Sequence, residues 1–261
     1  MNPSLKSLIA NNASITAPGV GDALGAIMVE KCGFPSVYVS GYQVSATLGY
    51  PDVGLITMTE MVNQLTRICA SVKIPVISDA DTGYGGVVNV IRTVQEYERT
   101  GVSALHLEDQ IFPKKCARYG GKELVRSDEM RAKIRAATGA RSREEFLVIA
   151  RTDALSVVGL DEAIARGKRF RAEVEGPLVV TLGSWDVPVD AKGVGDLGYQ
   201  IVLIPNATMR VSIKAILACL EQLKPSGDVN ALIPMMAPLS LRDELVGLEQ
   251  VTAWERKYAA N

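Results

Sequence analysis

The sequence is poor in histidine, aromatic residues and paired cysteines, and each shortage excludes a class of protein. Its only histidine, His106, leaves no set of imidazoles for a zinc site. Aromatic residues make up only 5% of the 261 residues, so Val, Ile, Leu and Ala must pack the core, as they do in buried parallel sheets. The four cysteines (32, 69, 116 and 219) form neither a CxxC pair nor a disulfide framework, which favours reduced thiols in a cytoplasm.

Strong charge and long apolar runs are also lacking. The formal net charge is −1, which gives no reason to expect nucleic acid as a partner. The first twelve residues lack the basic stretch and apolar run of a secretory signal. No stretch approaches the roughly 18 apolar residues that a membrane helix needs. We therefore expect a soluble, cytoplasmic protein with neither nucleic-acid nor membrane partners.

Short apolar runs alternate regularly with helical patterns. The predicted strands are Ser14–Ala17, Ser36–Ser40, Pro75–Asp79, Ala104–Glu108, Phe146–Arg151, Pro177–Thr181 and Gln200–Pro205. The predicted helices are Gly21–Lys31, Thr59–Ser71, Val87–Thr100, Ser127–Thr138, Leu160–Arg171, Met209–Leu223 and Leu239–Tyr258, with loops at 183–195 and 224–228. Such alternation predicts a parallel α/β sheet. At this length one domain over 1–261, a (β/α)8 TIM barrel, is favoured over an open doubly wound sheet. The first strand-to-helix turn, Pro18–Asp22, also lacks a GxGxxG signature.

One βα unit, after about Arg171, is missing from the sequence. Only seven strands are found, and the helix that ends at Arg171 passes almost directly into the strand at Pro177. Either seven strands close or leave a gap, or another segment replaces the eighth, or the protein has a stretch that this sequence does not include. We predict the third outcome, because Ala172–Gly176 is too short for a helix end and a strand. A spatial gap between Arg171 and Pro177 should then separate elements in regular barrel positions.

Acidic side chains gather at the ends of three predicted strands. Asp79 ends one strand and Asp81 follows it, Glu108 ends the next, and Asp153 follows the strand that ends at Arg151. The C-terminal ends of barrel strands meet at one mouth, where active sites lie. Carboxylates brought together there need a cation, and oxygen ligands favour Mg²⁺ or Mn²⁺. Strand alternation would send Asp79 and Asp81 to the same side; alternatively, Asp81 or Thr82 caps the following helix.

Two further polar residues stand at this predicted mouth. Arg151 ends an apolar strand, and it forms either a structural salt bridge to Glu108 or Asp153 or a clamp for a substrate carboxylate. Cys116 follows two lysines in a loop and precedes Arg118. Neighbouring cations lower the pKa of a thiol and make it a usable acid or base, although a lone cysteine is commonly a packing residue.

Four segments together resemble the isocitrate lyase/phosphoenolpyruvate mutase superfamily, nearest to its methylisocitrate lyase and dimethylmalate lyase branch. They are SGYQVSATLGYPDVGLITMTE (40–60), PVISDADTGYGG (75–86), HLEDQIFPKKC (106–116) and VIARTDAL (148–155). The resemblance implies a (β/α)8 barrel that forms homo-oligomers, tetramers or dimers, with the last helix (239–258) exchanged between subunits.

The resemblance also implies roles for individual residues. Asp79 would bind Mg²⁺ directly, and Asp52, Asp81 and Glu108 would act mostly through its waters. Cys116, on a mobile gating loop, would be the general acid/base. The residues that would contact a small 2-oxo or 2-hydroxy acid are Ser40, Gly41, Tyr42, Arg151, Thr181 and Asn206, of which Tyr42 and Arg151 are also counted as catalytic.

The sequence departs from this family at two site positions. Ala117-Arg118-Tyr119 follows Cys116, where lyases continue with Gly-His, and Thr181 stands where lyases carry Asn, as in the oxaloacetate decarboxylase branch. The leading hypothesis is a Mg²⁺-dependent carbon–carbon lyase that cleaves a 2-hydroxy dicarboxylate of the substituted malate or methylisocitrate type into a 2-oxo acid and a carboxylic acid. The alternatives are an oxaloacetate-type decarboxylase or hydrolase, a mutase of the same superfamily, and an inactive acid-binding barrel.

Overall fold

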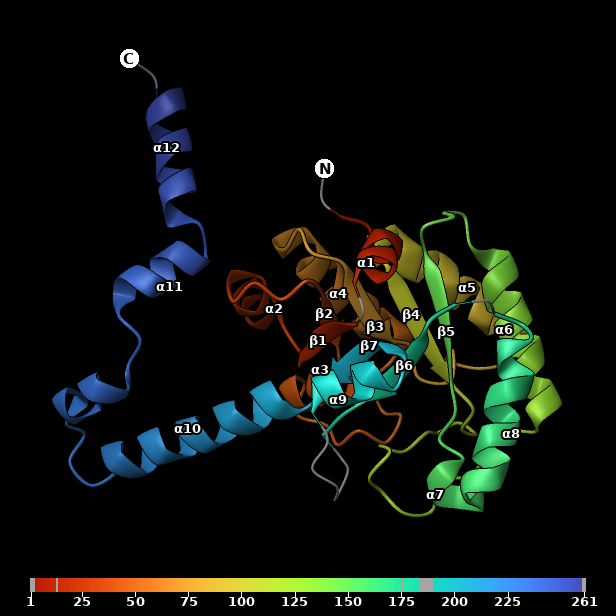
Figure 1. The fold of residues 1–261 in the computed structure, drawn as a ribbon. Coiled ribbons are helices and arrows are strands. Elements are labelled where there is room, and N and C mark those ends of the chain that lie inside the picture. The colour runs from red at the N-terminus through yellow and green to blue at the C-terminus, as the bar shows by residue number, and fades with distance from the viewer. Residues whose placement is uncertain (1–2, 13, 175, 184–189, 260–261) are drawn as a thin grey trace. The chain divides into compact units, whose positions relative to one another are not determined.

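The computed structural model describes residues 3–12, 14–174, 176–183 and 190–259 (Figure 1). The chain divides into two compact units, Met1–Thr208 and Met209–Asn261, and each is described by itself. That the whole chain forms one domain stays a prediction.

The first unit is an α/β fold around a parallel sheet shaped like a nearly closed barrel, which confirms the predicted fold class (Figure 1). Its strands follow one another in the order β5-β4-β3-β2-β1-β7-β6. They are β1 (Ile15–Val20), β2 (Val37–Val39), β3 (Val76–Asp79), β4 (Ala104–Glu108), β5 (Leu147–Arg151), β6 (Leu178–Thr181) and β7 (Tyr199–Ile204). Each overlaps a predicted strand.

Nine helices of the described residues belong wholly to this unit. They are α1 (Leu5–Asn11), α2 (Ala23–Lys31), α3 (Gly41–Thr47), α4 (Met58–Ser71), α5 (Val87–Arg99), α6 (Ser127–Ala140), α7 (Leu155–Val158), α8 (Leu160–Arg171) and α9 (Ala191–Asp196). The predicted loop 183–195 is wrong where α9 begins, and residues 184–189 lie outside the described part. The four helices α1, α3, α7 and α9 are too short to show a periodic apolar pattern.

Apolar side chains form two layers, one inside the barrel and one between strands and helices. The inner layer contains Ile15, Tyr38 and Ile77 together with Leu5 of α1, which is 1% exposed. Successive strand residues point to opposite faces, so Val37 and Val39 lie in the outer layer instead. Helix α1 therefore packs on the interior of the barrel, and the polar strand ends are left for the opposite mouth.

The sheet contains seven strands and is open between β5 and β6. Strand β5 pairs with β4, and β6 pairs with β7; no strand among the described residues lies between β5 and β6. The described residues thus contain seven strands with an opening, and the predicted third outcome, a stretch that this sequence does not include, stays a prediction. Ala172–Val174 follow α8 and Gly176 precedes β6, while Glu175 lies outside the described residues. The spatial break expected across this link thus stays a prediction.

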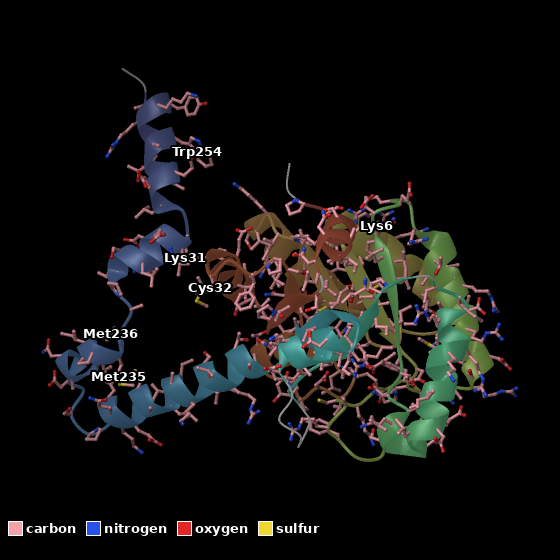
Figure 2. All side chains as sticks on the ribbon, in the orientation of Figure 1. Lys6, Lys31, Cys32, Met235, Met236 and Trp254 are labelled. Carbon is pink, nitrogen blue, oxygen red and sulfur yellow. The ribbon has the colours of Figure 1, made fainter. Side chains whose placement is uncertain are left out.

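The second unit carries many exposed apolar side chains. Helix α10 (Ala207–Leu223) begins in the first unit, and η1 (Val229–Met235), α11 (Leu239–Leu245) and α12 (Leu248–Tyr258) follow. The predicted single helix 239–258 is wrong at Gly247, whose φ of 71° is left-handed and separates α11 from α12. Figure 2 shows the side chains of Met235, Met236 and Trp254, and that of Trp254 is 55% exposed.

No helix in the described ranges has the length and apolar character needed to cross a membrane.

Candidate active site

The carboxyl ends of β3, β4 and β5 place the predicted polar residues side by side. Asp79 at the end of β3 is the sheet partner of His106 in β4, and Glu108 at the end of β4 is the partner of Arg151 in β5. Glu108, Asp79 and Asp81 are 1%, 4% and 2% exposed. The predicted convergence of acids at one barrel mouth is therefore present.

The turn after β3 is left-handed rather than extended. Strand β3 ends at Asp79, and Asp81 has a φ of 46°, so the expected strand alternation through Asp81 is wrong. A hydrogen bond of 3.0 Å from the Asp81 amide to Asp79 Oδ1 holds the turn. The alternative cap at Asp81 or Thr82 is also wrong, because Gly86 is the N-cap of α5. A non-glycine residue at positive φ is strained, and such strain collects at functional sites.

The N-terminus of α3 lies directly against the acidic pair. A Cβ on Gly41 would come within 2.7 Å of Asp79 Oδ2 and 3.4 Å of Asp81 Oδ1, so any larger residue would force the Asp79 carboxylate to move. Ser40, 2% exposed, is the N-cap, and Tyr42 is half-buried in the first turn. The first amides of a helix lack intrahelical partners. The Ser40 amide donates to the Val20 carbonyl at 3.1 Å, and the predicted contact of Ser40, Gly41 and Tyr42 with a substrate carboxylate stays a prediction.

Lys114 connects the cysteine loop to the acids, and the sequence reasoning did not assign it a role. Its Nζ lies 2.5 Å from Asp52 Oδ1 and 2.8 Å from Asp81 Oδ1, and its side chain is 3% exposed. Burial alone lowers the pKa of this lysine, but the surrounding carboxylates outweigh burial and raise the pKa well above its ordinary value. In the sequence, only the PKKC motif (113–116) pointed to this lysine. Asp52, buried at 5% exposure, joins the site through this ion pair.

Cys116 is buried beside Asp52, and its expected low pKa is wrong. The Cys116 amide donates to the Asp52 carbonyl at 3.0 Å, and the residue is 7% exposed. Burial raises the pKa of the thiol, which the Arg118 amide and Lys114 only partly oppose. Lys114 is directed to the carboxylates instead of the sulfur. The thiol therefore keeps its proton at neutral pH and suits a proton donor better than a base or nucleophile.

Arg151 forms both of the structural salt bridges that the sequence suggested. Its Nη1 lies 3.1 Å from Glu108 Oε2, and its Nη2 lies 3.1 Å from Asp153 Oδ2. Gln110 Nε2 also donates to Asp153 at 2.8 Å. The arginine side chain remains 25% exposed. Burial raises the pKa of Glu108 well above its ordinary value despite the guanidinium.

His106 and Tyr38 form a buried pair that the sequence reasoning missed. The Tyr38 hydroxyl lies 2.6 Å from His106 Nε2, and His106 Nδ1 lies 3.6 Å from Asp79 Oδ1. Burial lowers the pKa of His106 to about 4, so the ring is neutral at pH 7. The sequence signal that could have placed His106 in the site was its spacing from Glu108, because two residues separated by one along a strand point to the same face of β4.

Thr181 and Asn206 lie at the carboxyl edge of the sheet. Thr181 ends β6, and Asn206 follows the end of β7 by two residues. Oδ1 of Asn206 is buried without a hydrogen-bond partner in the described part of the chain. Their predicted contact with substrate stays a prediction.

The oxygen donors at the mouth suit a hard divalent cation, although they do not form a preassembled cage. Within the described ranges, no three His, Cys, Asp or Glu residues are grouped closely enough to hold a metal by themselves. Glu108 Oε1 is nevertheless buried with no hydrogen-bond partner in those ranges. Mg²⁺ retains several waters and binds through few carboxylates. The four carboxylates therefore fit a Mg²⁺ ion that Asp79 would bind directly and that Asp52, Asp81 and Glu108 would contact through water.

These features define a (β/α)-barrel protein with an acidic, arginine-containing site at the carboxyl mouth. Residues 5–172 match the family model described as phosphoenolpyruvate phosphomutase. The chain is 36% identical to 2,3-dimethylmalate lyase of Eubacterium barkeri over an alignment of 282 residues, which covers 98% of this chain and 97% of the relative. It is 34% identical to 2-methylisocitrate lyase of Aeropyrum pernix over 269 residues, covering 93% and 86%. The chain belongs to the isocitrate lyase/phosphoenolpyruvate mutase superfamily, as its motifs predicted.

Solved structures give the same family and several chemistries. A phosphoenolpyruvate phosphomutase from Streptomyces platensis subsp. rosaceus matches with a TM-score of 0.94 and 29% identity, covering 98% of both chains. Oxaloacetate acetylhydrolase bound to 3,3-difluorooxalacetate matches at 0.90 and 31%, covering 99% and 97%. Phosphonopyruvate hydrolase with oxalate and Mg²⁺ matches at 0.87 and 28%, covering 98% of both. The relatives are enzymes, mostly carbon–carbon lyases but also hydrolases and mutases.

Proposed function

We propose that the protein is a Mg²⁺-dependent carbon–carbon lyase that cleaves a 2-hydroxy dicarboxylate of the substituted malate or methylisocitrate type. The products are a 2-oxo acid and a carboxylic acid. The observation that carries the proposal is the pair of contacts that join the Cys116 loop to the acidic mouth, from Lys114 Nζ to the Asp52 carboxylate and from the Cys116 amide to the Asp52 carbonyl. This arrangement brings a protonated thiol and a carboxylate cluster to one site. The similarity to dimethylmalate and methylisocitrate lyases supports the substrate class.

The residues of this chain divide the reaction between them. The Ser40-Gly41-Tyr42 segment binds the carboxylate next to the 2-hydroxyl group through the amides of Gly41 and Tyr42, since the Ser40 amide donates to the Val20 carbonyl at 3.1 Å. Arg151 contacts the oxygen that becomes the 2-oxo group. A carboxylate of the mouth takes the hydroxyl proton, the adjacent carbon–carbon bond breaks, and its electron pair stays on the departing carbon. Cys116 donates its thiol proton to that carbon. Thr181 and Asn206 contact the rest of the substrate.

Asp79 would hold Mg²⁺, or Mn²⁺ in its place, and Asp52, Asp81 and Glu108 would act mostly through its waters. When bound, the ion stabilises negative charge on the substrate oxygens. The Mg²⁺ in the related phosphonopyruvate hydrolase structure supports this assignment.

A homo-oligomer is part of this proposal. The second unit exposes large apolar side chains such as Val211 (68%), Leu239 (69%) and Trp254 (55%). Apolar patches of this kind mark protein interfaces. Exchange of the region 239–258 between subunits of a dimer or tetramer would cover part of this surface. Light scattering of the purified protein tests the assembly, and a monomer would contradict it.

An oxaloacetate-type hydrolase or decarboxylase is the second candidate. Its support is Thr181 at the end of β6, the absence of histidine after Cys116 and the similarity to oxaloacetate acetylhydrolase. A screen of small 2-oxo and 2-hydroxy acids with Mg²⁺, with products identified by mass, separates the two. A lyase releases a 2-oxo acid without CO₂. Turnover of oxaloacetate alone would favour the second candidate, and no Mg²⁺-dependent turnover would favour an inactive acid-binding barrel.

A further inference from the structure

Gln110, the last residue of the LEDQ sequence, has no part in the proposed function, yet its side chain lies between the two halves of the site. It is 1% exposed. Its Nε2 donates to Asp153 Oδ2 and to the Lys115 carbonyl, both at 2.8 Å, and its Oε1 accepts the Lys115 amide at 2.9 Å. Both N–H donors of the side-chain amide are therefore used. One side chain thus joins the residue before Cys116 to the acid that holds Arg151.

The orientation of the Gln110 amide is fixed by these partners. Burial raises the pKa of Asp153, but Arg151 and Gln110 outweigh burial and lower it, so this carboxylate is ionised and only accepts hydrogen bonds. The Lys115 backbone N–H only donates. A flipped amide would therefore set its oxygen against the carboxylate and its NH₂ group against the Lys115 N–H. Two segments of the chain thus require the same orientation of one side chain.

The backbone around Gln110 is held firmly, so the side chain cannot simply follow a displaced partner. Gln110 forms an antiparallel bridge with Leu124. The side chain of Asp109, 0% exposed, accepts the Asp153 amide at 2.9 Å and the Arg166 guanidinium at 3.1 Å. The end of β4 and the turn after β5 are therefore joined to each other by buried contacts, and Gln110 projects from this support.

The peptide unit between Lys115 and Cys116 is held from two sides. Its carbonyl oxygen accepts from Gln110 Nε2 at 2.8 Å, and its N–H donates to the Asp52 carbonyl at 3.0 Å. A peptide unit is planar, so the two contacts together fix the direction in which the Cys116 side chain leaves the backbone. Loss of the Gln110 contact would let this unit turn about the Asp52 contact and expose the thiol.

The Arg151 guanidinium is held by the same glutamine through Asp153. Asp153 Oδ2 accepts Gln110 Nε2 at 2.8 Å and Arg151 Nη2 at 3.1 Å. Removal of the glutamine amide would leave the carboxylate free to turn with the guanidinium. The positions of the arginine and of the Cys116 thiol are thus linked through one side chain, and such a coupling acts equally in both directions.

We propose that Gln110 is a positioning residue that couples Arg151 to the Cys116 loop, so that an acid bound to the arginine also fixes the thiol. The part played by the acid rests on the proposed function. The coupling of arginine and thiol rests on contacts that this chain makes without any ligand.

The test measures alkylation of Cys116 by iodoacetamide in the ligand-free full chain, followed on its peptide by mass spectrometry. Gln110→Met keeps the length of the side chain but not its polar atoms, and it should raise the rate at least about 5-fold. The rate at Cys69, which reports global unfolding, should not change. Gln64→Met is the matched control, because Gln64 also donates to a backbone carbonyl, that of Gly21, at 2.8 Å. An unchanged Cys116 rate in Gln110→Met, or an equal rise in the control, would overturn the proposal.

A double-variant cycle tests whether the link runs through Asp153. Asp153→Asn should also raise the Cys116 rate, since an amide keeps the shape of the carboxylate but has one acceptor oxygen instead of two. Combined with Gln110→Met, it should change the rate by less than about 2-fold more, because members of one hydrogen-bond network are not additive. Independent effects that multiply would overturn the coupling. If Gln110→Met does not fold, an unchanged rate in Asp153→Asn alone would overturn it.

Calorimetric titration with oxalate and Mg²⁺ tests the part played by the acid. We expect Gln110→Met to raise the Kd of oxalate at least about 5-fold, although Gln110 lies behind Asp153 and not against the acid. An unchanged Kd would overturn this half of the proposal. Failure of oxalate to bind the wild-type protein would contradict the proposed function instead, and the alkylation rates, measured without ligand, would still decide the coupling.

Discussion

Replacing Lys114 by methionine tests whether this lysine is the cation that holds the metal-free site together. Methionine retains the apolar stem but removes the charge that lies 2.5 Å from Asp52 and 2.8 Å from Asp81. Both carboxylates are at least nine-tenths buried. Removing one partner of a buried ion pair costs about 3–5 kcal/mol, because the other charge is left uncompensated. In a protein of this size, that loss lowers the Tm by about 10 °C.

The assay is thermal and urea unfolding in excess chelator, with Lys115→Met as the matched control. Lys115 is the next residue, and its exposed Nζ donates to the Gly121 carbonyl at 2.8 Å. The control should therefore change stability by less than about 0.5 kcal/mol. Equal stability losses in the two variants would refute the role assigned to Lys114.

The pH dependence of this loss follows from Asp81. Burial raises the pKa of Asp81 to about 6, above its ordinary value of 3.8. The folded protein therefore binds one more proton than the unfolded chain between these values, and Asp81 favours the folded state as the pH falls through 6. The penalty of Lys114→Met should be smallest near pH 5 and should grow above pH 6. A penalty independent of pH would contradict the assignment.

Three other outcomes are expected. Chelation should abolish turnover and Asp79→Ala should lower the rate at least about 100-fold, whereas full activity in excess chelator would eliminate the metal from the mechanism. Cys116→Ala should keep the fold and acid binding but lose about 10²–10⁴-fold in turnover, the usual weight of a general acid; normal turnover would show that the thiol is not the proton donor. Gly83→Ala should destabilise the protein by about 1–3 kcal/mol in urea unfolding, because φ is 83° and the new Cβ would lie 2.5 Å from Val90 Cγ2; wild-type stability would contradict this strain.

The strands and the acids at their ends could be predicted because both depend on local sequence. A run such as Val76–Asp79 begins with two apolar residues and ends in Ser78 and Asp79, and parallel strands end at a common edge whatever the loops do. The helix α4 was predictable for a similar reason. Thr57 and Glu60 form a capping box at its start, and Met61, Leu65 and Ile68 recur at the helical period and are fully buried.

The environment of the cysteine loop could not be predicted, because neighbours in sequence are not neighbours in space. The sequence places two lysines before Cys116 and so suggests a positive surrounding. In the fold, Lys114 reaches Asp52, 62 residues away, and Lys115 turns to the exposed Gly121 carbonyl. The sulfur is left with burial as the largest influence on its pKa. Similarly, only the left-handed turn at Asp81 directs its carboxylate to Lys114, and no alternating pattern could show it.

Arg151 shows how two alternatives that the sequence left open can both hold. A guanidinium has five N–H donors. Arg151 uses Nη1 toward Glu108, and Nε and Nη2 toward Asp153, at 3.3 and 3.1 Å. Nη2 also donates to Asp153 Oδ2 at 3.1 Å, so one N–H bond, on Nη1, remains, and the side chain is 25% exposed at the mouth. The salt bridges fix the plane of the guanidinium, and the remaining donor can meet a substrate oxygen without breaking either bridge. A structural role and a substrate contact are therefore compatible in Arg151, because Glu108 and Asp153 do not use all of the N–H donors of its guanidinium.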